Sequence, residues 1–186
     1  MRKKIKNMTR IPINGMLIAV YIVLSLPMLT VNIGGLKFTF EHFPVLLSAV
    51  LYGPIDALLV GVLGELINQL TTFGLTPTTV LWILPIAVRA LIVGVSGQMF
   101  KKQMNPKSLV KELTIVFFIV CILSGVVSSC LNTLALYVDS KLFGYYTYEL
   151  VFGVLFLRIT LSVITSFVMA NVITPILYAL KKAHLV

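Results

Sequence analysis

The sequence has little charge and lacks the short motifs that accompany the commonest kinds of catalysis. Charged residues make up 11% of its 186 residues, and it contains two histidines and two cysteines. It has no Gly-x-x-x-x-Gly-Lys-Ser/Thr loop for phosphates, no His-Glu-x-x-His pair for zinc and no Gly-x-Ser-x-Gly nucleophile turn. We therefore expect no catalytic residue, no bound metal or cofactor, and no ATPase activity in the chain itself. Cys121 and Cys130 fall on different turns of one apolar segment, which does not suit a disulfide.

The chain is instead rich in apolar residues. Hydrophobic residues make up 59% of the chain, and the mean hydropathy is +1.03. The length has room for about six membrane-spanning helices of roughly 20 residues each. No hydrophilic segment is long enough to fold alone, so residues 1–186 are predicted to form a single all-α transmembrane domain. The six expected helices run from about Ile13 to Val31, Phe40 to Tyr52, Ile55 to Thr72, Thr78 to Phe100, Leu113 to Val138 and Glu149 to Leu180.

Basic residues are confined to a few of the links between these helices. Five lie in the arm 1–12, four in the loop 101–112 and two in the C-terminal tail, whereas the remaining links hold only Lys37 and Lys141. By the positive-inside rule, both termini and the 101–112 loop are expected in the cytoplasm. The same distribution argues against nucleic acid as the partner of the net charge of +9. The basic start is not followed by an Ala-x-Ala site, so a cleavable signal peptide is not expected.

Polar side chains nevertheless occur within the expected spans, at helical spacing. The rise of about 1.5 Å per residue places polar groups of four helices roughly 9–16 Å below one membrane face. Such groups are costly in lipid unless they meet one another or a cavity. The polar stripes comprise Glu65, Asn68, Gln69 and Thr72; Thr78, Trp82, Pro85 and Arg89; and Ser124, Ser128 and Asn132. The predicted substrate-binding residues are Glu65, Asn68, Gln69, Thr72, Thr78, Trp82, Arg89, Asn132 and Arg158.

The charges in this cluster are unbalanced. Arg89 and Arg158 outnumber Glu65, and a spare arginine fits an anionic ligand such as a carboxylate held by two hydrogen bonds. Arg158 has the alternatives of pairing with Glu149 or reaching interfacial water. Three other interpretations stay open: helix–helix hydrogen bonding with a plain Glu65–Arg89 ion pair, a proton-coupled secondary transporter that uses Glu65, and a membrane enzyme or scaffold. No internal repeat is evident, which counts against the secondary transporter.

Two further features concern contacts with partners or ligands. Gly15 and Ala19 form a small-xxx-small pattern, which lets another helix approach closely, either within this chain or from a partner. The aromatic loop 143–148, with Tyr145 and Tyr146, is typical of an interfacial belt or of a lid over an outward pocket. The link 32–40, with Gly34-Gly35, is a second candidate lid.

These residues resemble the substrate-binding S-components of energy-coupling factor (ECF) vitamin transporters. Gly15-x-x-x-Ala19 is similar to the family's docking motif, although alanine is usual at both ends. Leu51-Tyr-Gly-Pro-Ile-Asp-Ala-Leu-Leu-Val-Gly61 is similar to the family's Gly-Pro turn into its third helix. Glu65-Leu-Ile-Asn-Gln-Leu and Gly74-Leu-Thr-Pro-Thr-Thr-Val-Leu-Trp-Ile-Leu-Pro most resemble the pantothenate branch.

The resemblance implies a non-enzymatic subunit of the bacterial cell membrane that binds a vitamin tightly at the outer face. Its partners would be a coupling membrane subunit and two ATPase subunits, which use ATP and Mg²⁺, and it would release the vitamin by reorienting in the membrane. Gly15 and Ala19 would dock, and Gly34 and Gly35 would hinge a lid. The expected ligand is pantothenate, with cobalamin, folate, pyridoxine and hydroxymethylpyrimidine as alternatives.

Overall fold

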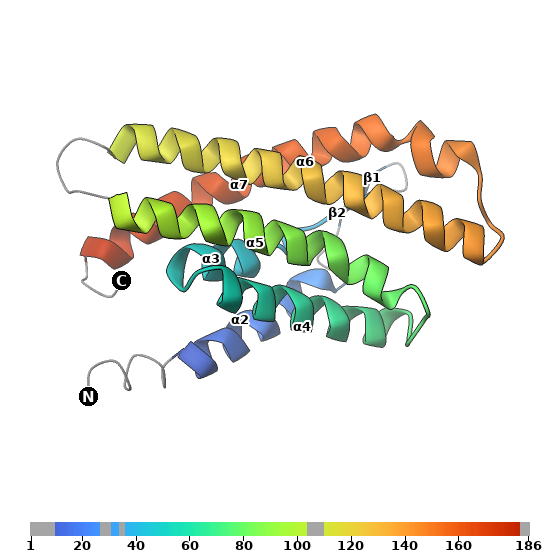
Figure 1. Ribbon diagram of the computed structural model, residues 1–186, viewed down its shortest axis with the longest axis horizontal. Helices are drawn as coiled ribbons and strands as arrows, with labels where there is room; N and C mark the ends of the chain where they lie inside the picture. Colours follow the sequence, from blue (N-terminus) through green and yellow to red (C-terminus); the bar gives the residue numbers. More distant parts are fainter. Residues whose placement is uncertain (1–9, 27–30, 34–35, 104–109, 183–186) are drawn as a thin grey trace.

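A computed structural model describes residues 10–26, 31–33, 36–103 and 110–182. In the described residues the secondary structure is helical apart from one small hairpin (Figure 1). The elements in chain order are α2 (Arg10–Ser25), β1 (Val31–Ile33), β2 (Leu36–Phe38), α3 (Phe43–Leu51), α4 (Pro54–Thr72), α5 (Thr79–Gln103), α6 (Val110–Leu142), the π-helix η2 (Glu149–Gly153) and α7 (Leu155–Lys182).

Four of these helices are long and apolar enough to cross a bilayer. Their candidate spans are Pro54–Thr72, Thr79–Gln98, Ile115–Leu142 and Glu149–Ile176. Helix α2 has 16 residues, and α3 has nine, which is about 13 Å of rise against the roughly 30 Å of a hydrocarbon core. The predicted helices therefore occur in the predicted order, but the structure does not establish six spanning helices.

Proline and glycine explain why the first two helices are short. The sequence places Pro27 two residues beyond Ser25, and a residue before proline disfavours the helical conformation. The prediction that the first helix runs to Val31 did not take Pro27 into account and was wrong, because α2 ends at Ser25. Gly53 has a φ of +104°, which only glycine adopts readily, and it separates α3 from α4, which begins at Pro54.

The link predicted to be merely polar contains an antiparallel hairpin. Val31 pairs with Phe38, Asn32 with Lys37 and Ile33 with Leu36. Gly-Gly between two short runs with β-branched or aromatic residues is a hairpin signal that the all-α prediction overlooked. Gly34 and Gly35 themselves lie outside the described residues, so their role as a lid hinge stays a prediction.

The long helices lie side by side with their ends gathered in two groups (Figure 1). The start of α2, the end of α5, the start of α6 and the end of α7 lie at one end of the bundle. The α4–α5 and α6–η2 links lie at the other. The predicted loop 139–148 is shorter than expected, because α6 continues to Leu142 and takes Asp139 into its last turn. Gly144, with a φ of +76°, makes the turn that follows.

Helices α2 and α3 pack against α4 and α5 around a buried core. Its fully buried members include Tyr21, Leu46, Val60, Val93, Cys121 and Ile173. Large apolar side chains elsewhere face outward; Ile55 is 73% exposed and Phe156 is 78% exposed. A surface of this kind suits lipid rather than water. The long apolar helices are those of a multi-pass membrane protein.

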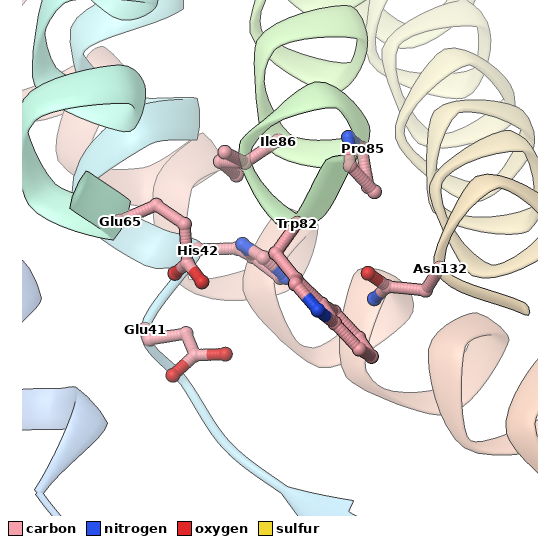
Figure 2. A pocket seen from close by; sticks show the side chains of 7 residues that line it. All are labelled: Glu41, His42, Glu65, Trp82, Pro85, Ile86 and Asn132. Carbon is pink, nitrogen blue, oxygen red and sulfur yellow. The ribbon is translucent and has the colours of Figure 1, made fainter. Parts of the chain in front are cut away.

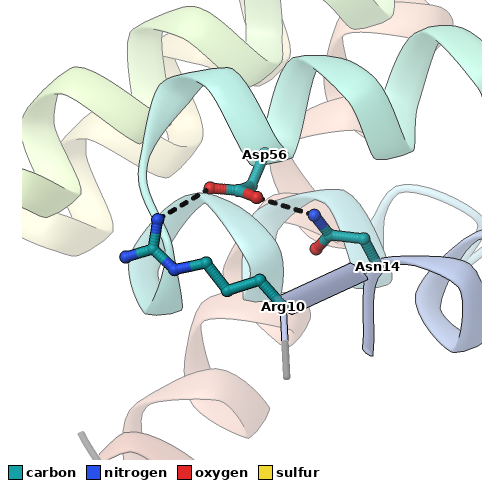
Figure 3. Close-up of polar contacts among 3 residues, drawn as sticks. All are labelled: Arg10, Asn14 and Asp56. Carbon is teal, nitrogen blue, oxygen red and sulfur yellow. Dashed lines mark hydrogen bonds and ion pairs between the residues drawn. The ribbon is translucent and has the colours of Figure 1, made fainter. Parts of the chain in front are cut away.

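The start of α2 is tied to the start of α4 by polar contacts around Asp56 (Figure 3). Asn14 Nδ2 donates to Asp56 Oδ1 at 2.7 Å, and Arg10 Nη1 lies 3.8 Å from Asp56 Oδ2. The guanidinium of Arg10 also lies 5.7 Å from the ring centroid of Tyr52, in the turn between α3 and α4. These contacts fix which face of α2 is turned toward the bundle and which is left open.

Candidate ligand-binding pocket

A small cavity lies where α4, α5, α6 and the turn before α3 meet. Its volume is about 40 Å³, and it is lined by Glu41, His42, Glu65, Trp82, Pro85, Ile86 and Asn132. Figure 2 shows the Glu41 and Glu65 carboxylates directed toward the same space, with the Trp82 ring extending toward Asn132. Helical spacing explains the α5 contribution, because residues 82, 85 and 86 lie on one face. The structure thus brings together three of the predicted site residues, Glu65, Trp82 and Asn132.

Glu65 is the most thoroughly bonded group at the pocket. Tyr21 Oη donates to Glu65 Oε2 at 2.7 Å, and Gln69 Nε2 donates to Oε1 at 2.7 Å. A third donor, Asn68 Nδ2, lies 3.3 Å from Oε2. An ionised carboxylate accepts only, so these donors match its charged form. Burial of a carboxylate is costly without such partners, and the predicted α4 stripe supplies two of them.

The rest of the α4 stripe lies outside the pocket wall. Asn68 and Gln69 act on Glu65, as described above, and are not lining residues. Thr72 is exposed, and its hydroxyl donates at 3.4 Å to Asn68 Oδ1. The stripe is therefore a chain of hydrogen bonds that runs from the end of α4 inward to Glu65.

Arg89 lies one turn beyond the pocket residue Ile86 and is 2% exposed. Its Nη2 donates to Ser166 Oγ of α7 at 2.8 Å, and its Nε has no hydrogen-bond partner. No ion pair joins Arg89 to Glu65 in the described structure. The structure thus places this predicted carboxylate partner behind the pocket wall.

Arg158 donates hydrogen bonds to backbone carbonyls just before the last helix, α7. Its Nη2 donates to the Leu150 carbonyl at 3.0 Å, and its Nη1 lies 3.5 Å from the Val151 carbonyl. Both acceptors belong to the π-helix η2, whose geometry departs from the regular α-helical bonding that follows. The structure therefore places Arg158 at η2 and not among the residues that line the pocket.

Thr78 and Tyr145 meet at a residue that the sequence analysis did not select. Thr78 Oγ1 donates to Asp139 Oδ1, and Tyr145 Oη donates to Asp139 Oδ2. Thr78 and Asp139 are buried, whereas Tyr145 is partly exposed. Burial, together with the hydrogen bond to Asp139 and its negative charge, raises the pKa of the Tyr145 phenol to about 12. These two hydrogen bonds, which we call the Asp139 clasp, join the α4–α5 link and the turn after α6 to the end of α6.

Tyr146, the other predicted lid tyrosine, belongs to an aromatic group beside this clasp. Lys141 Nζ lies 4.2 Å from the Tyr146 ring centroid, and the Tyr137 ring meets Tyr146 edge-on at 5.5 Å. Aromatic rings with a lysine at a helix end are typical of a membrane–water interface. The structure therefore leaves both tyrosines at the end of the bundle where a lid is expected.

Glu41 and His42 were missed from the sequence. Both precede Pro44, at the start of the largely buried helix α3. Two polar residues immediately before such a helix are a signal that was available, but it is weak, because most residues at that position face solvent. In the part of the chain that the structure describes, no three metal-ligating side chains gather into a site.

The predicted docking residues Gly15 and Ala19 lie on an open face of α2. Both are exposed, as are Ile11, Met16 and Val20. A β-carbon placed on Gly15 would meet no atom within 4 Å. Nothing in the described chain covers this small, apolar face, so close packing within the chain does not account for Gly15.

The sequence of residues 6–180 matches the family described as ECF transporter, substrate-specific component. No curated protein gives a significant match to the chain.

Proposed function

The chain belongs to the family of ECF transporter substrate-specific components, and from this premise we propose that it captures a water-soluble vitamin in the pocket formed by α4, α5 and α6. Members of this family bind substrate, are not catalytic, and work with ECF membrane and ATPase subunits. The observation that carries the proposal is the cluster of polar residues around one cavity inside a bundle of apolar helices. Polar groups at membrane depth are a functional site by default.

Ligand entry requires the pocket to widen. Its volume of about 40 Å³ is far below the roughly 300 Å³ at which small-molecule sites begin. Glu41 and His42 sit on the short segment between β2 and α3, which is not part of a helix. Movement of this segment, together with the hairpin before it, opens the pocket without unfolding a long helix.

The proposed orientation follows from charge. The predicted basic loop 101–112 lies in part within helices, because α5 continues to Gln103 and α6 begins at Val110. Lys101, Lys102 and Lys111 therefore lie at the end of α5 and the start of α6, at the end of the bundle where α2 starts and α7 ends. This end faces the cytoplasm by the positive-inside rule. The opposite end, with the Asp139 clasp and the aromatic residues, then faces outward. Trp82 lies only three residues into α5 from that end, so the pocket is reached from outside.

Delivery depends on partners in this proposal. The open face of α2, with Gly15 and Ala19, docks on the coupling subunit, since small residues let helices approach closely. The subunit reorients to release the vitamin inside, and the ATPase partners use ATP and Mg²⁺ to reset the complex.

Pantothenate is the ligand that the sequence resemblance favours. Its carboxylate would pair with Arg89, which has an unpartnered Nε but lies behind the wall next to Ile86. Binding in that way requires two movements: the pocket has to open toward solvent to admit the ligand, and the wall at Ile86 has to move so that Arg89 reaches the cavity. Cobalamin, folate, pyridoxine and hydroxymethylpyrimidine belong in the same test.

The test has two parts. The purified chain, without partners, is titrated calorimetrically with each of these five vitamins, and sub-micromolar binding of one is expected. Uptake into proteoliposomes is then measured with and without the coupling and ATPase subunits, and should need both partners and ATP. Uptake by the chain alone, driven by a proton gradient, would overturn the proposal in favour of a secondary transporter that uses Glu65. Absence of binding and of uptake would overturn it in favour of a structural role.

A further inference from the structure

The Asp139 clasp lies on the side of the pocket that α5 and α6 form. Trp82 N donates to the Thr78 carbonyl at 3.3 Å, so Thr78 lies one helical turn from a residue that lines the pocket. Asp139 follows the pocket residue Asn132 by two helical turns, on the same face of α6. The hydrogen bond from Thr78 to Asp139 therefore crosses from the start of α5 to α6, between the pocket and the end of the bundle.

The two hydrogen bonds of the clasp have different reach. The bond from Thr78 joins the start of α5 to the end of α6, whereas Tyr145 lies in the turn directly after α6 and bonds locally. Thr78 and Asp139 are 1% and 9% exposed, so water competes little for the bond between them. Thr78 therefore provides the closure between the two helices, and Tyr145 orients the carboxylate that accepts it.

The segment that Thr78 anchors is bounded by two interruptions of regular structure. Gly74 has a φ of +75°, and a β-carbon at this position would meet no atom within 4 Å. At the other end, Pro85 lies inside α5 and has no amide hydrogen to continue the helical hydrogen bonds. Residues 75–84 between them carry Trp82 and begin at Leu75, which is 80% exposed. This segment can therefore move as a unit while the rest of α5 stays folded.

We propose that residues 75–84 form a gate to the pocket between α5 and α6, and that the hydrogen bond from Thr78 to Asp139 is its latch. While the latch is closed, the Trp82 ring extends toward the α6 wall (Figure 2). When the latch opens, the segment turns about its two ends and carries Trp82 away from α6, which admits water to the cavity. The role of this gate in ligand retention rests on the proposed function, but its movement needs no ligand.

Trp82 is the single tryptophan of the chain and lies in the segment that moves, so its fluorescence reports on the gate. The full chain is reconstituted in lipid nanodiscs and titrated with acrylamide, a neutral quencher that reaches Trp82 from water. Thr78→Val removes the latch hydroxyl but keeps the shape of the side chain. Loss of a hydrogen bond to a charged group should raise the open population by about 10- to 100-fold, and quenching of Trp82 should rise with it. Thr78→Ser, which keeps the hydroxyl, should behave like the wild type.

Two controls separate the gate from other effects of substitution. Thr71→Val is the matched change, because the exposed Thr71 hydroxyl bonds to carbonyls of its own helix near the same end of the bundle. Gly94→Ala tests general loosening, since its β-carbon would lie 2.4 Å from Pro54 Cα, where α4 begins, at the opposite end of this helix from the gate. Neither control should change the quenching.

Tyr145→Phe should increase quenching less than Thr78→Val, because it leaves the bond between the helices in place. A melting curve accompanies each variant, and Tyr145→Phe carries the result if Thr78→Val does not fold.

Quenching in Thr78→Val that equals the wild type would overturn the gate, whichever vitamin the chain binds. An equal rise in Gly94→Ala would also overturn it, because the effect would then be a general loosening of the bundle. Absence of vitamin binding in the calorimetric titration would overturn the proposed function instead. It would leave the acrylamide result standing, because that measurement uses no vitamin.

Discussion

Glu65 is held by donors from two helices, and this defines its role at the scale of a single residue. Tyr21 reaches it from α2, and Gln69 from the next turn of α4. Both carboxylate oxygens thus accept hydrogen bonds from side chains of the fold, which hold the group in one orientation. The surroundings of Glu65 therefore suit a positioned acceptor at the pocket wall.

Removal of the Tyr21 hydroxyl should lower the stability of the protein, because the buried Glu65 loses a hydrogen-bond donor. Tyr21→Phe keeps the fully buried ring but leaves Glu65 Oε2 without its shortest hydrogen bond. We expect the free energy of unfolding to fall by about 1.5–3 kcal/mol, since hydrogen bonds to charged groups are worth that much. Unfolding in detergent measures it. Tyr148→Phe, at a residue 69% exposed, is the control, and equal stability of the two variants would contradict the prediction.

Tyr145 should give the outer clasp a dependence on alkaline pH. Its phenol has a pKa of about 12, raised from 10 by burial and by Asp139, so the folded state favours the protonated form. Its contribution to stability is therefore complete below about pH 10 and is lost as the pH rises toward 12. The stability difference between the wild type and Tyr145→Phe should be constant up to pH 10 and then shrink. A difference that is constant through pH 12 would show that the clasp does not hold the phenol.

The pocket could be predicted from sequence only where polar residues interrupt an apolar helix. Glu65, Trp82 and Asn132 were identifiable in this way, because lipid tolerates few such side chains. Glu41 and His42 lie before a helix, where polar residues are ordinary, and only the packing of α3 brings them to the cavity. The direction in which Arg158 points depends on the π-helix η2, for which the sequence carries no periodic signal.

Among the helices, close approach of α4 and α5 depends on Gly94. A β-carbon at this position would lie 2.4 Å from Pro54 Cα, a backbone atom that cannot move aside without shifting the start of α4. The contact lies where α4 begins, directly after the turn at Gly53.

Gly94→Ala should therefore destabilise the protein by about 1–3 kcal/mol, the usual cost of overpacking. This holds even though alanine favours a helix by about 1 kcal/mol over glycine. Gly15→Ala is the matched control, because nothing lies within 4 Å of its added methyl group, and it should be neutral or slightly stabilising. Melting temperatures in detergent compare the two. A Gly94→Ala variant as stable as Gly15→Ala would show that the two helices separate easily.

Hydropathy predicted the helices in their correct order, and it placed α4 within one residue. It could not decide which of them cross the membrane, because α2 and α3 are as apolar as the others but are cut short by proline and glycine. Strands of three residues are too short to show a period, so the Gly-Gly pair was the one sequence signal for the hairpin, and it was overlooked. The number of membrane-spanning helices depends on helix length, and helix length depends here on the proline and glycine residues that end α2 and α3.

For the whole molecule, the decisive surface is the open face of α2. The contacts of Arg10 and Asn14 with Asp56 hold the inner side of this helix on α4 and leave Gly15 and Ala19 outward. Their small size lets a partner helix approach closely.

Gly15→Leu should leave vitamin binding intact but impair vitamin uptake. The larger side chain meets no atom of this chain, so folding and vitamin binding should be unchanged. It should block the approach of the coupling subunit and reduce uptake in reconstituted proteoliposomes at least tenfold, whereas Gly15→Ala should preserve uptake. Full uptake by the Gly15→Leu variant would remove α2 from the docking surface.

The buried charges beside the pocket also have an electrical consequence. If the subunit reorients across the bilayer, Glu65 and Arg89 travel with it, and each net elementary charge moved through the membrane potential changes the energy by about 2.3 kcal/mol per 100 mV. One of these residues is acidic and the other basic, so together they add no voltage dependence to the movement, and a charged ligand would bring its own.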